Sequence, residues 1–118
     1  MKHIAIKRVY ESPSSTDGVR ILVDRLWPRG IKKSELIMDD WIKDLSPSSD
    51  LRKWFNHDPS KFKEFERRYI EELDENKKIW FPLIEKYLPG KITLLYAAHD
   101  QKINHAMCLK NYLESSCR

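Results

Sequence analysis

Two arginines that lie four residues apart, Arg25 and Arg29, are the side chains best suited to binding chemistry in this sequence. They follow an apolar segment, residues 19–23, and a Pro and a Gly flank the second arginine. A buried strand that ends in a charged loop is a common way for an α/β protein to present a site. A guanidinium donates paired hydrogen bonds to carboxylate, sulfate or phosphate groups. The two arginines therefore predict a site for a small anion.

A second polar segment, residues 99–105, follows the apolar run 91–98. If both apolar runs are parallel strands, the two polar segments meet at one edge of the sheet, and the amides of a helix that begins near this second segment point there. We expect Asn104 to orient an anion bound by the arginines. His105 is a tentative catalytic residue, because an imidazole can transfer protons near neutral pH.

Each candidate also has a structural explanation. Trp27 is a candidate stacking ring for the ligand site, but a place in the core or in a lid is the favoured explanation for it. Arg25 could form a structural ion pair with Asp24, and Arg29 could be an ordinary loop residue. His105 could only cap or pack the start of a helix.

The composition indicates one globular domain that spans residues 1–118. Hydrophobic residues make up 41% of the chain and charged residues 34%, which is too apolar for disorder. The net charge is +4, but Lys and Arg divide equally between the two halves of the chain. This even spread makes nucleic acid an unexpected partner.

The sequence also indicates the compartment. No apolar run approaches the ~20 residues of a membrane span, and the N-terminus lacks a signal-peptide core. Cys108 and Cys117 fall in one segment, and a helix would hold them roughly 13 Å apart, too far for a disulfide. We therefore expect free thiols in a reducing cytoplasm. We also expect Cys108 to be mostly buried and unreactive, because the apolar residues around it supply a helix face toward the core.

Metal and cofactor motifs are missing from the sequence. His99 and His105 are six residues apart, which is not a recurrent metal-ligand spacing. There is no Gly-rich phosphate loop, no HExxH and no GxSxG. We expect neither a metal nor a cofactor.

Apolar and turn patterns place the elements that must position these residues. They predict strands at 3–8, 19–24, 40–45 and 91–98, and helices at 31–37, around 51–55, from Asp58-Pro59 onward, at 79–88 and at 101–115. In the helix after Asp58-Pro59, spacings of three, four and four residues place Phe62, Phe65, Tyr69 and Leu73 on one apolar face. Strands that alternate with helices indicate an α/β domain with a mostly parallel sheet of about 3–5 strands flanked by helices.

Several motifs resemble one bacterial family. They are Arg20–Gly30, Trp41, Pro47-Ser48, Trp54-Phe55, Leu94–Ala98 and Asn104–Ala106. Together they resemble the YeaO-like group of the family called domain of unknown function 488, over essentially the whole chain. The resemblance implies a small cytoplasmic α/β domain without an established activity.

The same resemblance bears on catalysis. Longer members carry a Cys at the end of the last strand and a Cys-His-Arg at the next helix, where this chain has Tyr96 and Asn104-His105-Ala106. The layout also distantly resembles rhodanese-like domains, whose chemistry needs a thiolate in that loop. Residues 97–104 contain no Cys, so we do not expect persulfide transfer.

The leading hypothesis is a cytoplasmic protein with a small-anion site at the carboxyl-terminal edge of the sheet. The alternative is a module without catalytic activity that binds a protein or a nucleic acid. Catalysis and oligomeric state stay open at this stage.

Overall fold

A four-stranded parallel sheet lies at the centre of the protein. The computed structural model describes the backbone of residues 3–116 and the side chains of residues 3–115. The strands are β1 (Ile4–Arg8), β2 (Val19–Leu22), β3 (Asp40–Trp41) and β4 (Ile92–Tyr96), in the spatial order β1-β4-β2-β3. All three pairings are parallel, which confirms the predicted α/β class. β4 is buried along its whole length, as expected of a central strand.

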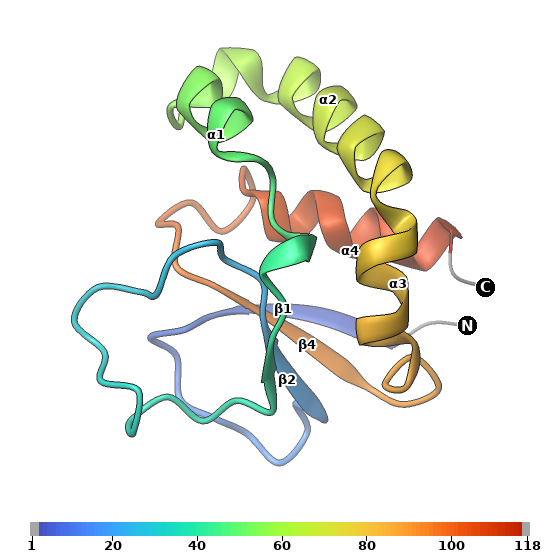
Figure 1. Cartoon of the computed structure of the whole chain (residues 1–118). Coiled ribbons are helices and arrows are strands. Elements are labelled where there is room, and N and C mark those ends of the chain that lie inside the picture. The colour runs from blue at the N-terminus through green and yellow to red at the C-terminus, as the bar shows by residue number, and fades with distance from the viewer. Residues whose placement is uncertain (1–2, 117–118) are drawn as a thin grey trace.

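Within residues 3–116, four α-helices and two short 3-10 helices complete the fold. They are η1 (Lys43–Leu45), α1 (Ser49–Phe55), η2 (Pro59–Lys61), α2 (Phe62–Glu75), α3 (Lys77–Glu85) and α4 (His105–Ser116). Figure 1 shows the helices gathered on one side of the sheet, while the loop between β2 and β3 projects away from them. None of the helices within residues 3–116 is long and apolar enough to cross a membrane.

Local sequence explains where the helices begin and which face they bury. The Ser48 side chain caps α1 by accepting a hydrogen bond from the Leu51 amide. The Asp58 side chain caps η2, with Pro59 in the first position, and the chain then continues into α2. Spacings of four residues along α2 bury Phe65, Tyr69 and Leu73 on one face, as predicted.

The two faces of the sheet are covered differently. The helical side carries the larger core, which includes Tyr69, Trp80 and Leu94. The opposite face carries a smaller cluster of Val9, Leu22, Leu36 and Leu95, and Trp27 and Trp41 pack against it. Successive residues of a strand point to opposite faces, so β4 contributes Leu94 to one core and Leu95 to the other.

Two predictions for residues 31–45 differ from the structure. Residues 31–37 form a turn flanked by irregular chain rather than a helix. Leu36 is buried in the smaller core. Two hydrogen bonds close the turn: the Glu35 amide donates to the Lys32 carbonyl, and the Lys32 amide donates to the Glu35 carboxylate. The predicted strand 40–45 is shorter, because β3 ends at Trp41 and η1 follows it.

The start of the last helix also differs from the prediction. The pattern predicted a helix over 101–115, whereas α4 begins at His105. Hydrogen bonds from side chains to the backbone hold residues 100–104 in turns, and such bonds compete with helix formation.

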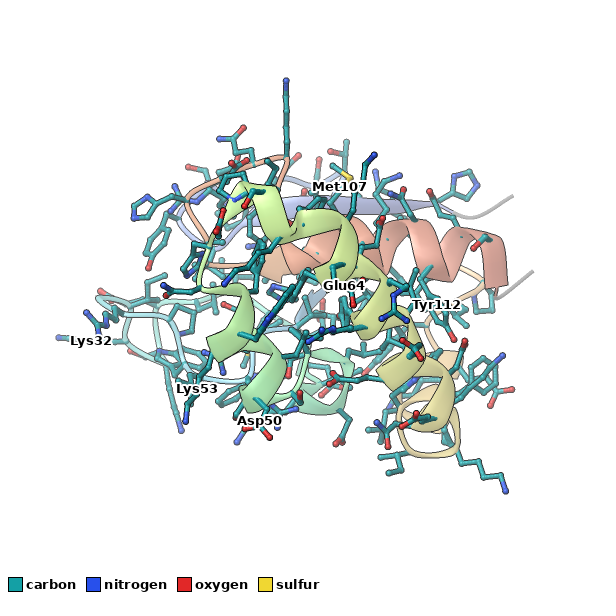
Figure 2. The ribbon with its side chains drawn as sticks, turned by 90° about the horizontal axis from the view of Figure 1, so that it is seen from above. Lys32, Asp50, Lys53, Glu64, Met107 and Tyr112 are labelled. Atoms are coloured by element: carbon teal, nitrogen blue, oxygen red, sulfur yellow. The ribbon has the colours of Figure 1, made fainter. Side chains whose placement is uncertain are left out.

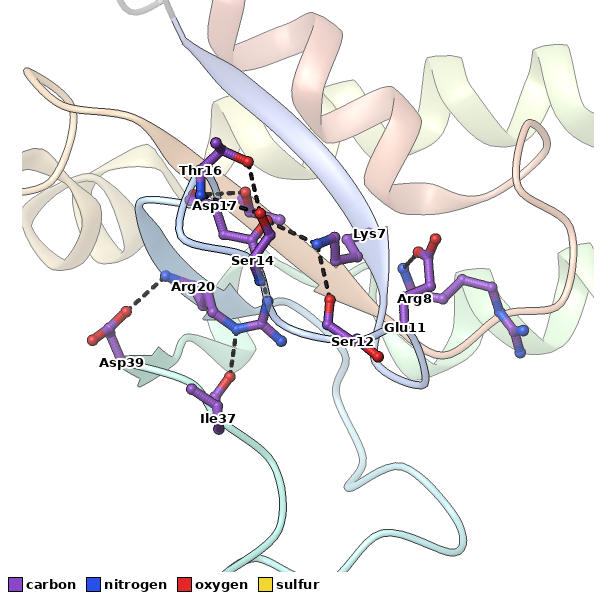
Figure 3. A network of polar contacts seen from close by, with 11 residues as sticks. Lys7, Arg8, Glu11, Ser12, Ser14, Thr16, Asp17, Arg20, Ile37 and Asp39 are labelled. Atoms are coloured by element: carbon purple, nitrogen blue, oxygen red, sulfur yellow. Dashed lines mark hydrogen bonds and ion pairs between the residues drawn. The ribbon is translucent and has the colours of Figure 1, made fainter.

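A buried polar network anchors the β2–β3 loop to the sheet (Figure 3). Asp17 forms ion pairs with Lys7 and Arg20, and its hydrogen bond from Lys7 lowers the pKa of Asp17 to about 2. The Arg20 Nε also donates to the Ile37 carbonyl at 2.6 Å, and the Arg20 amide donates to the Asp39 carboxylate at 2.8 Å. The network therefore fixes the loop that leads back into β3.

Candidate functional site

Asp24, just beyond β2, joins three segments at the carboxyl-terminal edge of the sheet. Its Oδ2 accepts a hydrogen bond from the Ala97 amide at 3.0 Å, directly after β4. Its backbone carbonyl accepts one from the Trp41 Nε1 at 2.7 Å, at the end of β3. Parallel strands bring these ends together, as expected. The predicted ion pair between Asp24 and Arg25 is not formed within 4.0 Å in the described part of the chain.

His105, the first residue of α4, faces Asp24. Its Nε2 lies 3.1 Å from the Val23 carbonyl oxygen and 3.2 Å from the Asp24 Oδ1, which is buried. A carbonyl oxygen can only accept, so the Nε2 carries the proton in this contact. Among residues 3–115, no hydrogen bond is made by the His105 Nδ1. The pair therefore ties the end of β2 to the start of α4 and leaves one ring nitrogen available.

Arg25 is half-buried and borders a hollow of about 300 Å³. Its Nε donates to the Pro47 carbonyl at 3.2 Å, which orients the guanidinium. The two terminal nitrogens of Arg25 have no hydrogen-bond partner and no carboxylate within 4.0 Å among the described residues. A guanidinium held by one bond, with its fork unpaired, is suited to a carboxylate or phosphate.

The hollow lies where the β2 exit meets the helical layer. Its other lining residues come from η1, the segment before α1, the end of α2 and the start of α3: Asp44, Ser46, Ser48, Glu72, Leu73, Glu75, Asn76 and Ile79. Glu72 already accepts hydrogen bonds from the Ser48 amide at 2.9 Å and from its hydroxyl at 2.6 Å. Asp44 and Glu75 are exposed. The carboxylates near Arg25 thus differ in how firmly they are held.

The loop after β4 uses its own side chains to satisfy its polar groups. The Asp100 Oδ1 accepts hydrogen bonds from the Lys102 and Ile103 amides, both at 2.8 Å. These bonds, with that from Ile103 the largest cause, lower the pKa of Asp100. Asn104 is buried; its Nδ2 donates to the Asp100 carbonyl and its Oδ1 accepts from the Met107 amide. Asn104 therefore caps α4.

The remaining candidates lie on the other side of the β2 exit. The Trp27 Nε1 donates to the Ile31 carbonyl at 2.6 Å, and its ring meets the Trp41 ring edge-on at 5.4 Å, within the smaller core. Arg29 is exposed, and its carbonyl accepts the Tyr10 hydroxyl at 3.0 Å. Neither residue lines the hollow. Figure 2 shows Lys32, farther along the same loop, at its outer tip.

The structure therefore groups the predicted residues in three places. Asn104 and His105 lie at the start of α4, Arg25 borders the hollow, and Trp27 and Arg29 lie in the loop beyond it. Sequence patterns missed Glu72 and Ser46 as neighbours of Arg25. No motif singles out Glu72, and only the packing of α2 over the β2 exit brings it close to Arg25.

The buried thiol matches its prediction. Cys108 is 1% exposed, and burial raises its pKa far above that of a free thiol. A thiol held protonated is a poor nucleophile. In residues 3–116 there is also no group of three or more His, Cys, Asp or Glu side chains that could hold a metal ion. Cys117 lies outside the described residues.

Comparisons with known proteins give the chain's relatives. Residues 3–118 match DUF488-N3i, described as the inactive DUF488-N3 subclade. The chain is 42% identical over 113 residues to the uncharacterized protein YeaO of Escherichia coli K12, which covers 96% of this chain and 98% of YeaO. It is 47% identical over 73 residues to the uncharacterized protein Rv3073c of Mycobacterium tuberculosis H37Rv, or 62% of each chain. No solved structure matches, so the distant likeness to rhodanese-like domains stays a prediction.

Proposed function

Since the chain belongs to the DUF488-N3i family, the inactive DUF488-N3 subclade, we propose that it binds a small ligand rather than transforming one. The ligand carries an anionic group, a carboxylate, sulfate or phosphate, which is held by Arg25 at the carboxyl-terminal edge of the sheet. We further propose a cytoplasmic location, because the buried Cys108 is a free thiol, the form that a reducing compartment preserves.

The unpaired guanidinium fork of Arg25 is the observation that carries this proposal. The Nε bond to the Pro47 carbonyl fixes the orientation of the side chain, while its terminal nitrogens lack a protein partner in the described chain. Hydrogen bonds to charged groups are worth about 1.5–3 kcal/mol each. A ligand anion that reaches the fork would gain such bonds at little ordering cost, because the arginine is already oriented.

Binding without turnover agrees with the chemistry available at this edge. The loop 97–104 lacks a thiol, and Cys108 is buried and held protonated. His105 uses its Nε2 to contact Val23 and Asp24. We assign His105 the role of a positioning residue that joins the β2 exit to α4.

The test is calorimetric titration of the folded protein with inorganic phosphate and, separately, with sulfate. We expect saturable binding that Arg25→Gln weakens by about tenfold or more, the equivalent of one charge-assisted hydrogen bond. Arg52→Gln is the control for the change in net charge, since Arg52 is an exposed arginine on α1 that does not line the hollow.

A second variant, Arg29→Gln, asks whether the other arginine of the predicted pair contributes. Equal loss of binding in Arg25→Gln and Arg52→Gln would mean that only net charge matters and would overturn the proposal. Absence of binding to either anion up to millimolar concentration, with the fold intact by circular dichroism, would overturn it as well.

A further inference from the structure

The charge of the hollow favours a ligand that carries a positive group beside its anionic one. One positive side chain, Arg25, and three negative ones, Asp44, Glu72 and Glu75, line it. At neutral pH the lining therefore carries a net negative charge, which raises the free energy of any simple anion that enters. A ligand that uses Arg25 must offset this repulsion.

The end of α2 adds to the negative potential. Its last turn carries Glu72 and Glu75 and no basic residue, although the carboxyl end of a helix favours cations. The sequence thus breaks a local rule of helix stability at the position where α2 borders the hollow. Such departures are expected where a residue serves a site rather than the fold.

Neighbouring lysines do not neutralise these carboxylates. The Lys43 Nζ lies over the Trp41 ring at 4.3 Å, and the Lys77 Nζ lies over the Phe81 ring at 5.6 Å. No Lys or Arg nitrogen comes within 4.0 Å of Asp44 or Glu75 in the part of the chain that the structure describes. Glu72 is held by Ser48, so Asp44 and Glu75 are the two carboxylates of the hollow that have no hydrogen bond or ion pair with any described residue.

We propose that the hollow binds a small zwitterion, with its anionic group on Arg25 and its ammonium group between Asp44 and Glu75. This inference rests on the proposed function, because it uses the same arginine. Amino carboxylates and aminoalkyl phosphates share the required chemistry. A volume of about 300 Å³ lies at the lower end for small-ligand sites and suits molecules of this size.

The experiment compares probes that carry one or both charges. Calorimetric titrations of the whole chain use phosphoethanolamine and γ-aminobutyrate as zwitterions, phosphate and acetate as anions, and ethylammonium as the cation. We expect at least one zwitterion to bind about tenfold or more tightly than its matched anion and than ethylammonium. The phosphate and carboxylate pairs then distinguish the two sources of the anionic group.

Variants separate the two ends of the ligand. The double variant Asp44→Asn/Glu75→Gln should lose the zwitterion's advantage while binding phosphate as well as, or better than, the parent. The control Asp50→Asn/Glu85→Gln makes the same charge change at two exposed residues that do not line the hollow, and should keep the advantage. Arg25→Gln should weaken both kinds of probe.

Three results decide the matter. If the zwitterions bind no better than the anions while Arg25→Gln still weakens phosphate binding, this inference is wrong and the proposed function stands. If the acidic variant and its control behave alike, the ammonium position is wrong. If no probe binds the folded protein at millimolar concentration, both proposals fail together.

Discussion

The loops that leave β2 and β4 lie at the same edge of the sheet, yet they treat their polar groups in opposite ways. After β4, Asp100 and Asn104 satisfy the amides of their own loop and of α4. After β2, Arg25 is oriented by a single bond, and its terminal nitrogens stay unpaired in the described structure. A polar segment at a sheet edge can thus be a completed cap or an open site, and its hydrogen bonds decide which.

Residues from three elements form the open side. Arg25, Asp44 of η1 and Glu75 of α2 line the same hollow. On the closed side, Asp100 is bonded to amides two and three positions away, and Asp24 accepts from the Ala97 amide at the start of the loop. Variants in the two loops should therefore change different quantities: unfolding free energy for the closed loop and binding for the open one.

The largest loss of unfolding free energy is expected on the central strand β4, which pairs with β2 and leads directly into the second loop. Leu95→Ala on the central strand leaves a cavity in the smaller core, where the side chain is fully buried. We expect a loss of about 2–5 kcal/mol of unfolding free energy. Urea denaturation measures it. Loss below about 1 kcal/mol would show that the loop-covered face of the sheet collapses around the cavity.

Asp24 is the direct link between the two loops. Asp24→Ala removes the acceptor of the Ala97 amide and the carboxylate that faces His105. We expect about 1–3 kcal/mol of destabilisation from the unsatisfied groups. The control Glu85→Ala removes an exposed carboxylate at the end of α3 and should stay within about 0.5 kcal/mol. Similar values for the two variants would mean that the loops are not coupled through Asp24.

Asn104 tests the closed loop alone. Asn104→Ala removes the cap on the Met107 amide and should cost about 0.5–2 kcal/mol. Phosphate affinity in the folded protein should stay unchanged, because Asn104 does not line the hollow. Asn111→Ala, an exposed position on the same helix, is the matched control for stability. Weaker phosphate binding in Asn104→Ala alone would place the ligand at α4 instead.

Acid should weaken the closed loop through Asp100. Its pKa is lowered because the Ile103 and Lys102 amides stabilise the carboxylate. This stabilisation is fully present above the ordinary pKa of 3.8 and is lost as the pH falls through the lower folded value. Carboxyl NMR titration should give a midpoint below 3.8 for Asp100. Asp100→Asn should lack this part of the pH dependence, and an unaltered acid profile would contradict the assignment.

The smallest effect is expected at Arg29. Its side chain is exposed, and its described hydrogen bond is made by its backbone carbonyl, so Arg29→Ala should change the unfolding free energy by no more than about 0.5 kcal/mol. Phosphate affinity should fall much less than in Arg25→Gln, because Arg29 is outside the hollow. An equal fall in both variants would restore the pair of arginines as a joint site.

Much of the fold could be predicted from local sequence. The apolar run around Leu94 and Leu95 identified the central strand, and the spacing of Phe65, Tyr69 and Leu73 identified the buried face of α2. Cys108 was correctly placed in the core. These features follow from periodicity and burial, which neighbouring residues determine. The helix predicted at 31–37 failed because Leu36 packs against the sheet, a contact with residues distant in the chain.

By itself, the sequence determined the class of fold, the parallel strands and the segments that meet at their carboxyl ends. It could not determine how each polar side chain would be used. Asn104 became a cap because its amide fits the first turn of α4, and Trp27 became a core ring because Trp41 packs beside it. Arg25 stayed open because α2 brings Glu72 and Glu75 near it without an ion pair. Hydrogen-bond pairing is sensitive to differences of a few tenths of an ångström in the distance between donor and acceptor, and only tertiary packing sets that distance between remote segments.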